Sequence, residues 1–223
     1  SNKYLVKKTD RKVVLPGFFS ENLEEENFIT KKLEAKVKEK ISLKNTFKII
    51  FTGRFDKNRG IYEFLKIAKI LKKEKDFRFE IFGFGNLKIK QDIENAILKQ
   101  DNLHLYYEAG RDVLLKHLIN SNISFNFLKD STFIQGSFPS KLIELITLTP
   151  VILSNFNVEE IASDRMILFN GSVKDAVNKI FFIKENYNRL YKNFIFDTEN
   201  KTYINKYSQK EKAKEIGNFI DEL

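Results

Sequence analysis

Two stretches of this 223-residue chain combine residue types that could hold an anion. The stretch GRFDKNRG contains Arg54 and Arg59, whose guanidinium groups suit the oxygens of a diphosphate through charge-assisted, bidentate hydrogen bonds. The stretch GSFPSKLIEL contains Pro139, which is typical of the first turn of a helix, because its missing N–H would go unpaired there. The free N–H groups around residues 137–141 then predict an anion-binding helix start.

A carboxylate follows this helix start at a distance that suits a nucleotide. Glu144 comes five residues after Pro139, which is about 7–8 Å along a helix axis. This is roughly the separation of a phosphate from the ribose hydroxyls, which a carboxylate accepts well. Ser140 lies one turn before Glu144 on the same face. The residues alone leave plainer roles open: an arginine paired with Asp56, a solvated Lys57, a serine bonded to local backbone and an exposed helix glutamate.

The elements that must position these groups alternate between strand-like and helix-like patterns from residue 47 onward. Short apolar runs predict strands at 47–53, 77–85, 102–107, 123–128 and 150–155. Helical spacing of apolar residues predicts helices at 59–73, 87–100, 111–121 and 172–186, with another beginning in the stretch 136–145. Such alternation indicates βαβ units, and hence an α/β, doubly wound, Rossmann-like parallel sheet flanked by helices.

We expect one domain with extensions at both ends. Residues 46–185 would form the Rossmann-like core, residues 1–45 an N-terminal extension and residues 186–223 a C-terminal helical extension. The first extension contains the strand-like KVVLPGF and a charged helix near 27–41. The chain begins Ser-Asn rather than with methionine, which is typical of a removed tag, so we expect a longer parent protein.

Glycines mark the edge of the sheet where a ligand would bind. In an open parallel sheet, ligands bind beyond the carboxyl ends of the strands. Gly53 ends the first predicted strand, Gly83 and Gly85 end the second, and Gly136 follows the fourth. Glycine permits a sharp turn and a close approach of ligand to backbone, although turns between strands and helices often use it for structure alone.

Composition excludes several classes of site. Cysteine is absent and only two histidines are present, which removes thiolate chemistry and disfavours a histidine-rich metal centre. Neither GxGxxG nor GK[ST] occurs, so a nicotinamide cofactor or a Walker-type nucleoside triphosphatase is not expected. No run of about 18 apolar residues is present.

The balance of charge is basic. Lysine plus arginine exceeds aspartate plus glutamate by 39 − 30 = 9. This excess suggests an anionic partner, although lysines that simply coat helices would give the same excess. Their spread over several helices argues against a nucleic-acid-binding face.

The chain resembles a known family over about residues 12 to 160. The segments GRFDKNRG, IFGFGN, NLHLYYEAGRDVLLKHLINSNISFNFL and FPSKLIEL, followed by PVI, are similar to the C-terminal half of the retaining, group 1 glycosyltransferases. Those are two-domain enzymes of the B-type architecture, and their C-terminal Rossmann-like domain holds the nucleotide-sugar donor. The segment VVLPGFF stands where the family has the segment that joins its two domains.

The resemblance implies roles for individual residues. Arg54 and Arg59 would contact the donor diphosphate and stabilise the leaving group, and Glu144 would bind the ribose. The remaining donor-binding residues that it implies are Gly53, Gly85, Tyr107 with the neighbouring Glu108 near the nucleobase, Gly136, Ser137, Phe138 and Ser140.

The chain departs from the family at two places. The family commonly has a second glutamate eight residues before the ribose-binding one, and this position is Gly136 here. The sugar contact must then come from backbone or from a neighbour such as Gln135. Between Glu144 and Pro150 the chain is one residue shorter than usual and lacks the usual glycine, so we expect a remodelled helix end.

The resemblance implies a hexosyltransferase-type enzyme that uses a nucleotide-diphosphate sugar in bacterial surface polysaccharide biosynthesis, such as that of lipopolysaccharide or capsule. It implies no separate cofactor, no metal and no nucleic acid. The acceptor would bind a missing N-terminal domain, without which this fragment would be inactive. The expected location is the cytoplasm, with peripheral association of the full-length enzyme at the inner face of the membrane. The alternatives are a degenerate, non-catalytic Rossmann-like scaffold domain and a basic nucleic-acid-binding module.

Overall fold

The computed structural model describes residues 4–8, 11–15, 23–38, 46–129, 140–157, 161, 163–208, 211, 213–214 and 217–218. A six-stranded parallel sheet has the order β5-β4-β3-β6-β7-β8. Its strands are β3 (Phe47–Phe55), β4 (Phe77–Gly85), β5 (Leu103–Tyr107), β6 (Ile123–Asn126), β7 (Val151–Ser154) and β8 (Met166–Leu168). The chain builds outward from β3 in one direction and then from β6 in the other. The prediction of a doubly wound, Rossmann-like sheet is therefore confirmed.

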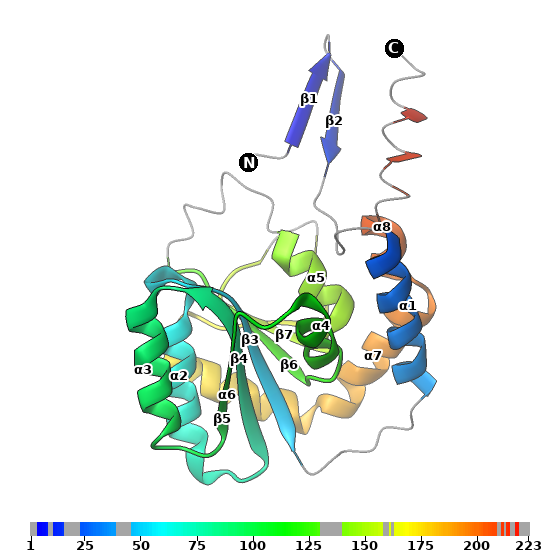
Figure 1. Cartoon of the computed structure of the whole chain (residues 1–223). Coiled ribbons are helices and arrows are strands. Elements are labelled where there is room, and N and C mark those ends of the chain that lie inside the picture. The colour runs from blue at the N-terminus through cyan, green and yellow to red at the C-terminus, as the bar shows by residue number, and fades with distance from the viewer. Residues whose placement is uncertain are drawn as a thin grey trace.

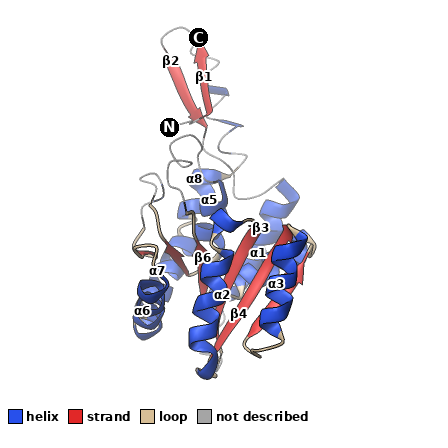
Figure 2. Cartoon of the chain, turned by 90° about the vertical axis from the view of Figure 1, so that its left-hand side faces the viewer, coloured by secondary structure: helices blue, strands red, loops and turns tan. Residues whose placement is uncertain are grey.

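Helices cover both faces of this sheet (Figure 1). One face carries α2 (Ile61–Ile70), α3 (Leu87–Ile97) and α6 (Val173–Glu185), with α2 packed against α6. The other carries α4 (Arg111–Ile119) and α5 (Ser140–Leu148), which pack against α1 (Leu23–Lys38) and α8 (Thr202–Tyr207) respectively. The remaining helix, α7 (Tyr187–Glu199), packs against α1, α6, α8 and β7. Figure 2 shows α2 and α3 lying side by side over β3 and β4.

The central strands are apolar because both of their faces are covered. Ile49, Ile50 and Phe51 of β3 are each 1% exposed or less. On the α2 side, the buried ring of Phe64 lies 5.4–5.7 Å from the rings of three strand phenylalanines: Phe51, Phe79 and Phe125. This aromatic cluster fixes α2 across β3, β4 and β6, the three strands around the reversal of strand order.

Several elements differ from the sequence prediction. β3 continues to Phe55, two residues beyond the predicted end, because Arg54 and Phe55 still pair with β4 and Phe55 is buried. The predicted helix 59–73 divides into η1 (Lys57–Arg59), α2 and η2 (Leu71–Lys73). β1 (Tyr4–Lys8) and β2 (Arg11–Leu15) form a hairpin. The sequence analysis predicted β2, in the segment KVVLPGF, but not β1. The division of the chain at 45 and 185 stays a prediction.

The junction between η1 and α2 depends on Gly60. This residue adopts a left-handed backbone conformation with φ of 78°. A Cβ atom here would lie 2.6 Å from Cγ of Phe127, which follows β6. The loops that leave β3 and β6 therefore approach one another only when position 60 has no side chain.

We expect Gly60→Ala to lower the free energy of unfolding by about 1–3 kcal/mol, because it combines overpacking with backbone strain. Urea denaturation measures this change. Gly110→Ala is the control, since a Cβ at Gly110 meets nothing within 4 Å; because Gly110 is the N-cap of α4, this change should lower stability by at most about 1 kcal/mol. Equal effects of the two substitutions would contradict the packing argument.

Candidate functional site

The candidate site lies where the strand order reverses, between β3 and β6. In addition to the contact at Gly60, the backbone N–H of Lys129 donates to the carbonyl of Asn58 at 2.8 Å. Asp56 accepts from the backbone N–H of Asn58 at 2.7 Å and so caps η1. These contacts hold the loop that carries Arg59 at the carboxyl edge of the sheet, which is the ligand-binding edge of an open α/β fold.

The first turn of α5 is fastened to β3 by Lys141. Its ammonium group donates to the backbone carbonyl of Thr52 and lies 5.4 Å from the centre of the Phe51 ring. A Cβ atom on Gly53 would lie 3.2 Å from the same nitrogen. Gly53 has a φ of 141°, which side chains rarely allow, so its conformation and the nearby Lys141 nitrogen both favour glycine at this position. The helix start predicted to bind an anion thus meets the end of β3.

Burial lowers the pKa of Lys141 to about 8. The carboxylate of Glu144 opposes this shift, whereas the guanidinium of Arg59 adds to it. Both side chains therefore lie within electrostatic reach of the ammonium group. Arg59 itself is exposed. The structure brings together two predicted site residues, Arg59 and Glu144, around a lysine that the sequence analysis had not singled out.

Glu144 is not the ordinary exposed helix glutamate that the sequence left open. Only 14% of its side chain is exposed, and it forms an ion pair with Arg111 at the start of α4. Arg111 also binds Glu25 of α1, with Nη2 donating to Oε1 at 2.8 Å and Nε donating to Oε2 at 3.3 Å. Burial raises the pKa of Glu144, and the attraction of Arg111 and Lys141 opposes this rise. A carboxylate has about four acceptor positions, so pairing with Arg111 leaves capacity for hydroxyl groups.

Three other predicted residues gather at the carboxyl end of β4. Arg54 is exposed, and its Cγ would lie 3.3 Å from a Cβ on Gly85. Gly85 has a φ of 117°, and its carbonyl accepts from the hydroxyl of Tyr107 at 3.3 Å. The ammonium group of Lys90 lies 4.8 Å from the centre of the Tyr107 ring. Arg54 follows Gly53 directly, so this group of residues continues the edge on which Lys141 lies.

Part of the predicted site cannot be placed. Gly136, Ser137, Phe138 and Pro139 lie outside the described residues. Ser140 is described as the first residue of α5, but its side chain is not. Their roles in donor binding stay predictions.

Sequence reasoning missed Lys141, Arg111 and Glu25. A signal existed for Lys141, because it precedes Glu144 by three residues and so shares its helix face. For Arg111 the signal was its position, because it follows Gly110 at the start of a helix, near the edge of the sheet where ligands bind. Glu25 lies 86 positions from Arg111, and no local pattern connects the two.

The far end of α5 is held by Arg165, whose side chain is 1% exposed. Its guanidinium donates to the carbonyls of Ile146 and Thr149, each at 2.8 Å. It also donates to the carbonyl of Pro150 at 3.1 Å and pairs with Asp197 of α7 at 2.8 Å. Arg165 thus satisfies carbonyls at a helix end that has no glycine cap.

Two classes of feature are not found in the part of the chain that the structure describes. Within those ranges, no three histidine, aspartate or glutamate side chains are grouped as a metal ion would require. Among the same residues, no helix has the length and apolarity needed to cross a membrane.

No protein-family profile and no curated protein matches the sequence. Solved structures do match the fold. One is the C-terminal domain of LpcC, a glycosyl transferase group 1 family protein of Francisella tularensis, with a TM-score of 0.54 and 16% identity over 85% of this chain and 95% of that one. This chain has the fold of a group 1 glycosyltransferase C-terminal domain.

Two further structures share this fold. TarM of S. aureus, a mutant in complex with fondaparinux, α-GlcNAc-glycerol and UDP, matches with a TM-score of 0.57 and 18% identity over 80% of this chain. The catalytic domain of cholesterol-α-glucosyltransferase from Helicobacter pylori matches with a TM-score of 0.52 and 19% identity, over 71% of this chain and 98% of that one. This chain spans only 36% of the matched TarM chain.

Lys141 predicts an unusual dependence of stability on pH. Its pKa is about 8 in the folded chain and 10.5 ordinarily, so between these values the unfolded chain binds more protons than the native one. The free energy of unfolding from this residue therefore rises with pH across that window, by at most about 1.4 kcal/mol per pH unit. Below pH 8 the buried charge is destabilising, and we expect Lys141→Met to be more stable than wild type at pH 7.

Urea denaturation at pH 7, 8, 9 and 10 measures this effect, as the difference between wild type and Lys141→Met. The difference should shrink as pH rises. Lys57→Met removes a solvent-exposed lysine nearby, and its free energy of unfolding should match that of wild type at every pH. A constant difference between Lys141→Met and wild type would refute the shifted pKa.

We expect Arg165→Ala to lower the free energy of unfolding by about 3–5 kcal/mol, because it leaves the carbonyls at the C-terminal end of α5 without donors and Asp197 without its partner. Thermal and urea unfolding measure the loss. Arg189→Ala removes an exposed arginine from α7 and should change stability by no more than about 0.5 kcal/mol. A small loss for Arg165→Ala would show that water replaces its hydrogen bonds.

Proposed function

We propose that this chain is the donor-binding domain of a retaining glycosyltransferase that uses a nucleotide-diphosphate sugar. The observation that carries the proposal is the contact of Lys141, in the first turn of α5, with the end of β3 at the reversal of strand order, with Arg59 on the loop after β3 within electrostatic reach. Two cations lie there beside the start of α5, and a carboxylate lies one turn further along the same helix. The fold that the chain shares with glycosyltransferase structures supports the same proposal.

The arrangement suits binding and stabilising a diphosphate. Arg59 would bind phosphate oxygens through its fork of N–H donors, and Arg54 would do so from the adjoining strand end. The free N–H groups at the start of α5 would add their partial positive charge. These groups stabilise the negative charge that develops on the departing nucleoside diphosphate when the sugar is transferred.

Lys141 and Glu144 would act next to that charge. The ammonium group of Lys141 lies between β3 and α5, where it would neutralise a phosphate without moving. A bound dianion would also favour its protonated form. Glu144 would accept hydrogen bonds from the ribose hydroxyls while Arg111 holds its side chain in place.

The finer parts of the proposal concern the parent enzyme. The acceptor and any general base would lie on a second, N-terminal domain, so this domain alone would bind nucleotide without transferring sugar. We propose a role in bacterial surface polysaccharide biosynthesis, in the cytoplasm at the inner face of the membrane. The donor would be the substrate itself, and no separate cofactor or metal is needed.

The ion pair of Glu144 with Arg111 favours one alternative, a degenerate scaffold domain. In such a domain this pair would only join α4 and α5, and nucleotide binding would be absent. The two functions differ in a directly measurable way.

Calorimetric titration with UDP and GDP tests the proposal. At least one nucleotide should bind wild type, and Arg59→Ala and Glu144→Ala should each weaken binding about 10-fold or more, because each removes a charge-assisted hydrogen bond. Circular dichroism should show that both variants stay folded.

Matched controls separate the site from overall charge. Lys57→Ala removes a neighbouring exposed cation from η1, and Glu185→Ala removes an exposed carboxylate from α6. Both should bind nucleotide like wild type. Failure of every nucleotide to bind wild type would instead support the scaffold domain.

A further inference from the structure

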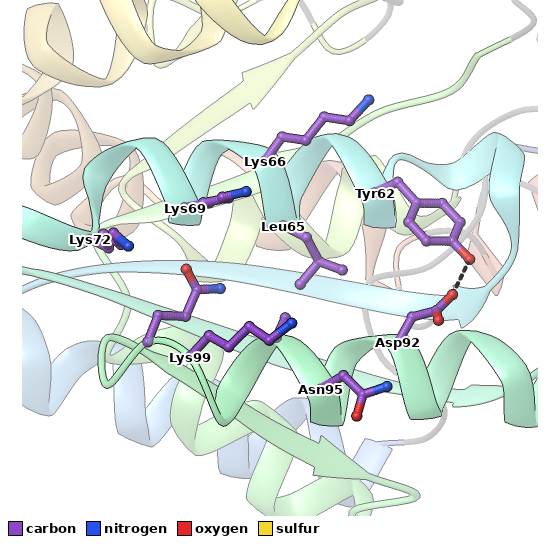
Figure 3. A pocket seen from close by; sticks show the side chains of 10 residues that line it. Tyr62, Leu65, Lys66, Lys69, Lys72, Asp92, Asn95 and Lys99 are labelled. Atoms are coloured by element: carbon purple, nitrogen blue, oxygen red, sulfur yellow. Dashed lines mark hydrogen bonds between the residues drawn. The ribbon is translucent and has the colours of Figure 1, made fainter.

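A hollow lies between α2 and α3, on the face of the sheet opposite α4 and α5 (Figure 1). It has a volume of about 380 Å³, which is within the usual range for small-molecule sites. Its two helices belong to the face away from α4 and α5, so the hollow, here called the α2–α3 groove, is separate from the cluster at Lys141. Figure 3 shows the residues that line it, which are Tyr62, Leu65, Lys66, Lys69, Lys72, Asp92, Asn95, Ala96, Lys99 and Gln100.

The groove is strongly cationic. Four lysines line it, and all four are exposed: Lys66, Lys69, Lys72 and Lys99. Among the described residues, none of them forms an ion pair. The only carboxylate in the lining is Asp92, which accepts from the hydroxyl of Tyr62 at 2.8 Å and closes one end of the groove (Figure 3). Four lysines thus share a lining with a single carboxylate, and in the described part of the chain none of the four is paired with it.

The lining also offers an apolar surface and an unused acceptor. Leu65 of α2 and Ala96 of α3 are partly buried and pack against the core. Gln100 is 7% exposed, and its Oε1 atom has no hydrogen-bond partner in the described part of the chain. A buried acceptor without a donor costs about 1–3 kcal/mol, and a ligand hydroxyl that reaches this end would offset the loss.

We propose that the α2–α3 groove binds a phosphate ester of a polyol. The phosphate lies against the ammonium groups of Lys69, Lys72 and Lys99 in the lining, because lysines bind phosphate oxygens as point charges. The carbon chain of the ester lies on Leu65 and Ala96. A free hydroxyl donates to Gln100.

Two sources supply this chemistry: a soluble phosphate ester and the headgroup of a glycerophospholipid. Exposed apolar side chains occur on the same helical layer, at Ile70 (57% exposed), Leu87 (72%) and Leu98 (84%). Apolar side chains next to unpaired lysines are typical of a surface that meets anionic lipid, since lysines keep their charge in water while their stems cover apolar groups. The experiment has one arm for each source.

In the first arm, sn-glycerol 3-phosphate is titrated into the isotope-labelled chain, and amide chemical shifts are followed. Signals from α2 and α3 should move in a saturable way. Lys69→Gln with Lys99→Gln should weaken this binding about 10-fold or more. The control pair, Lys73→Gln with Lys88→Gln, removes two exposed lysines from the same helical layer outside the lining and should leave it unchanged.

In the second arm, the chain is sedimented with vesicles of phosphatidylglycerol or of phosphatidylcholine. Binding to phosphatidylglycerol alone, lost in the groove pair and kept in the control pair, identifies a lipid source. Binding of glycerol 3-phosphate without vesicle binding identifies a soluble one. Failure of both probes, or equal weakening by the groove pair and the control pair, overturns the proposal, because it would show that the lysines contribute only general charge.

Discussion

The arrangement of the candidate site depends on one partly buried ammonium group. The first turn of α5 and the end of β3 approach each other because the Lys141 side chain crosses between them and donates to the carbonyl of Thr52. A side chain at Gly53 would crowd that contact, and Lys141 lies within electrostatic reach of both Glu144 and Arg59. Without it, the helix start and the strand end would be two separate features of the sheet edge. The site is therefore built around a positive charge that the protein keeps in an unfavourable, desolvated place.

Contacts elsewhere in the fold fix the elements that carry the charged residues of the site. The aromatic cluster around Phe64 sets α2 on three strands, and the contact between Gly60 and Phe127 brings two loops together. Arg165 fixes the opposite end of α5 through carbonyl groups rather than through apolar packing. Each of these contacts lies outside the candidate site. One end of α5 is therefore stabilised by Arg165, whereas its first turn holds a charge that costs stability. Such a trade-off between stability and function is common at binding sites.

The sequence predicted the fold well because its signals are local. Alternating strand and helix patterns are sufficient to indicate a parallel, doubly wound sheet, and glycines mark where strands end. Arg59 and Glu144 could be selected by residue type and spacing. Lys141 shares the helix face of Glu144, but a lysine in a helix is usually solvated, so its contact with β3 is not visible in the sequence. Arg165 gives no sign in its polar surroundings that it is buried. Glu25 meets Arg111 only through tertiary structure, across 86 positions of the chain. Roles that arise from such distant pairing leave no trace in a single sequence.

The sharing of Arg111 between Glu25 and Glu144 has a consequence for communication within the molecule. Glu25 pairs with the Nε and Nη2 atoms of the guanidinium and Glu144 pairs with Nη1, so one arginine side chain joins α1, α4 and α5. Displacement of α1 would remove Glu25 from this arginine and so loosen the guanidinium that holds Glu144. By thermodynamic reciprocity, any ligand whose binding at Glu144 depends on that hold would in turn stabilise the attachment of α1.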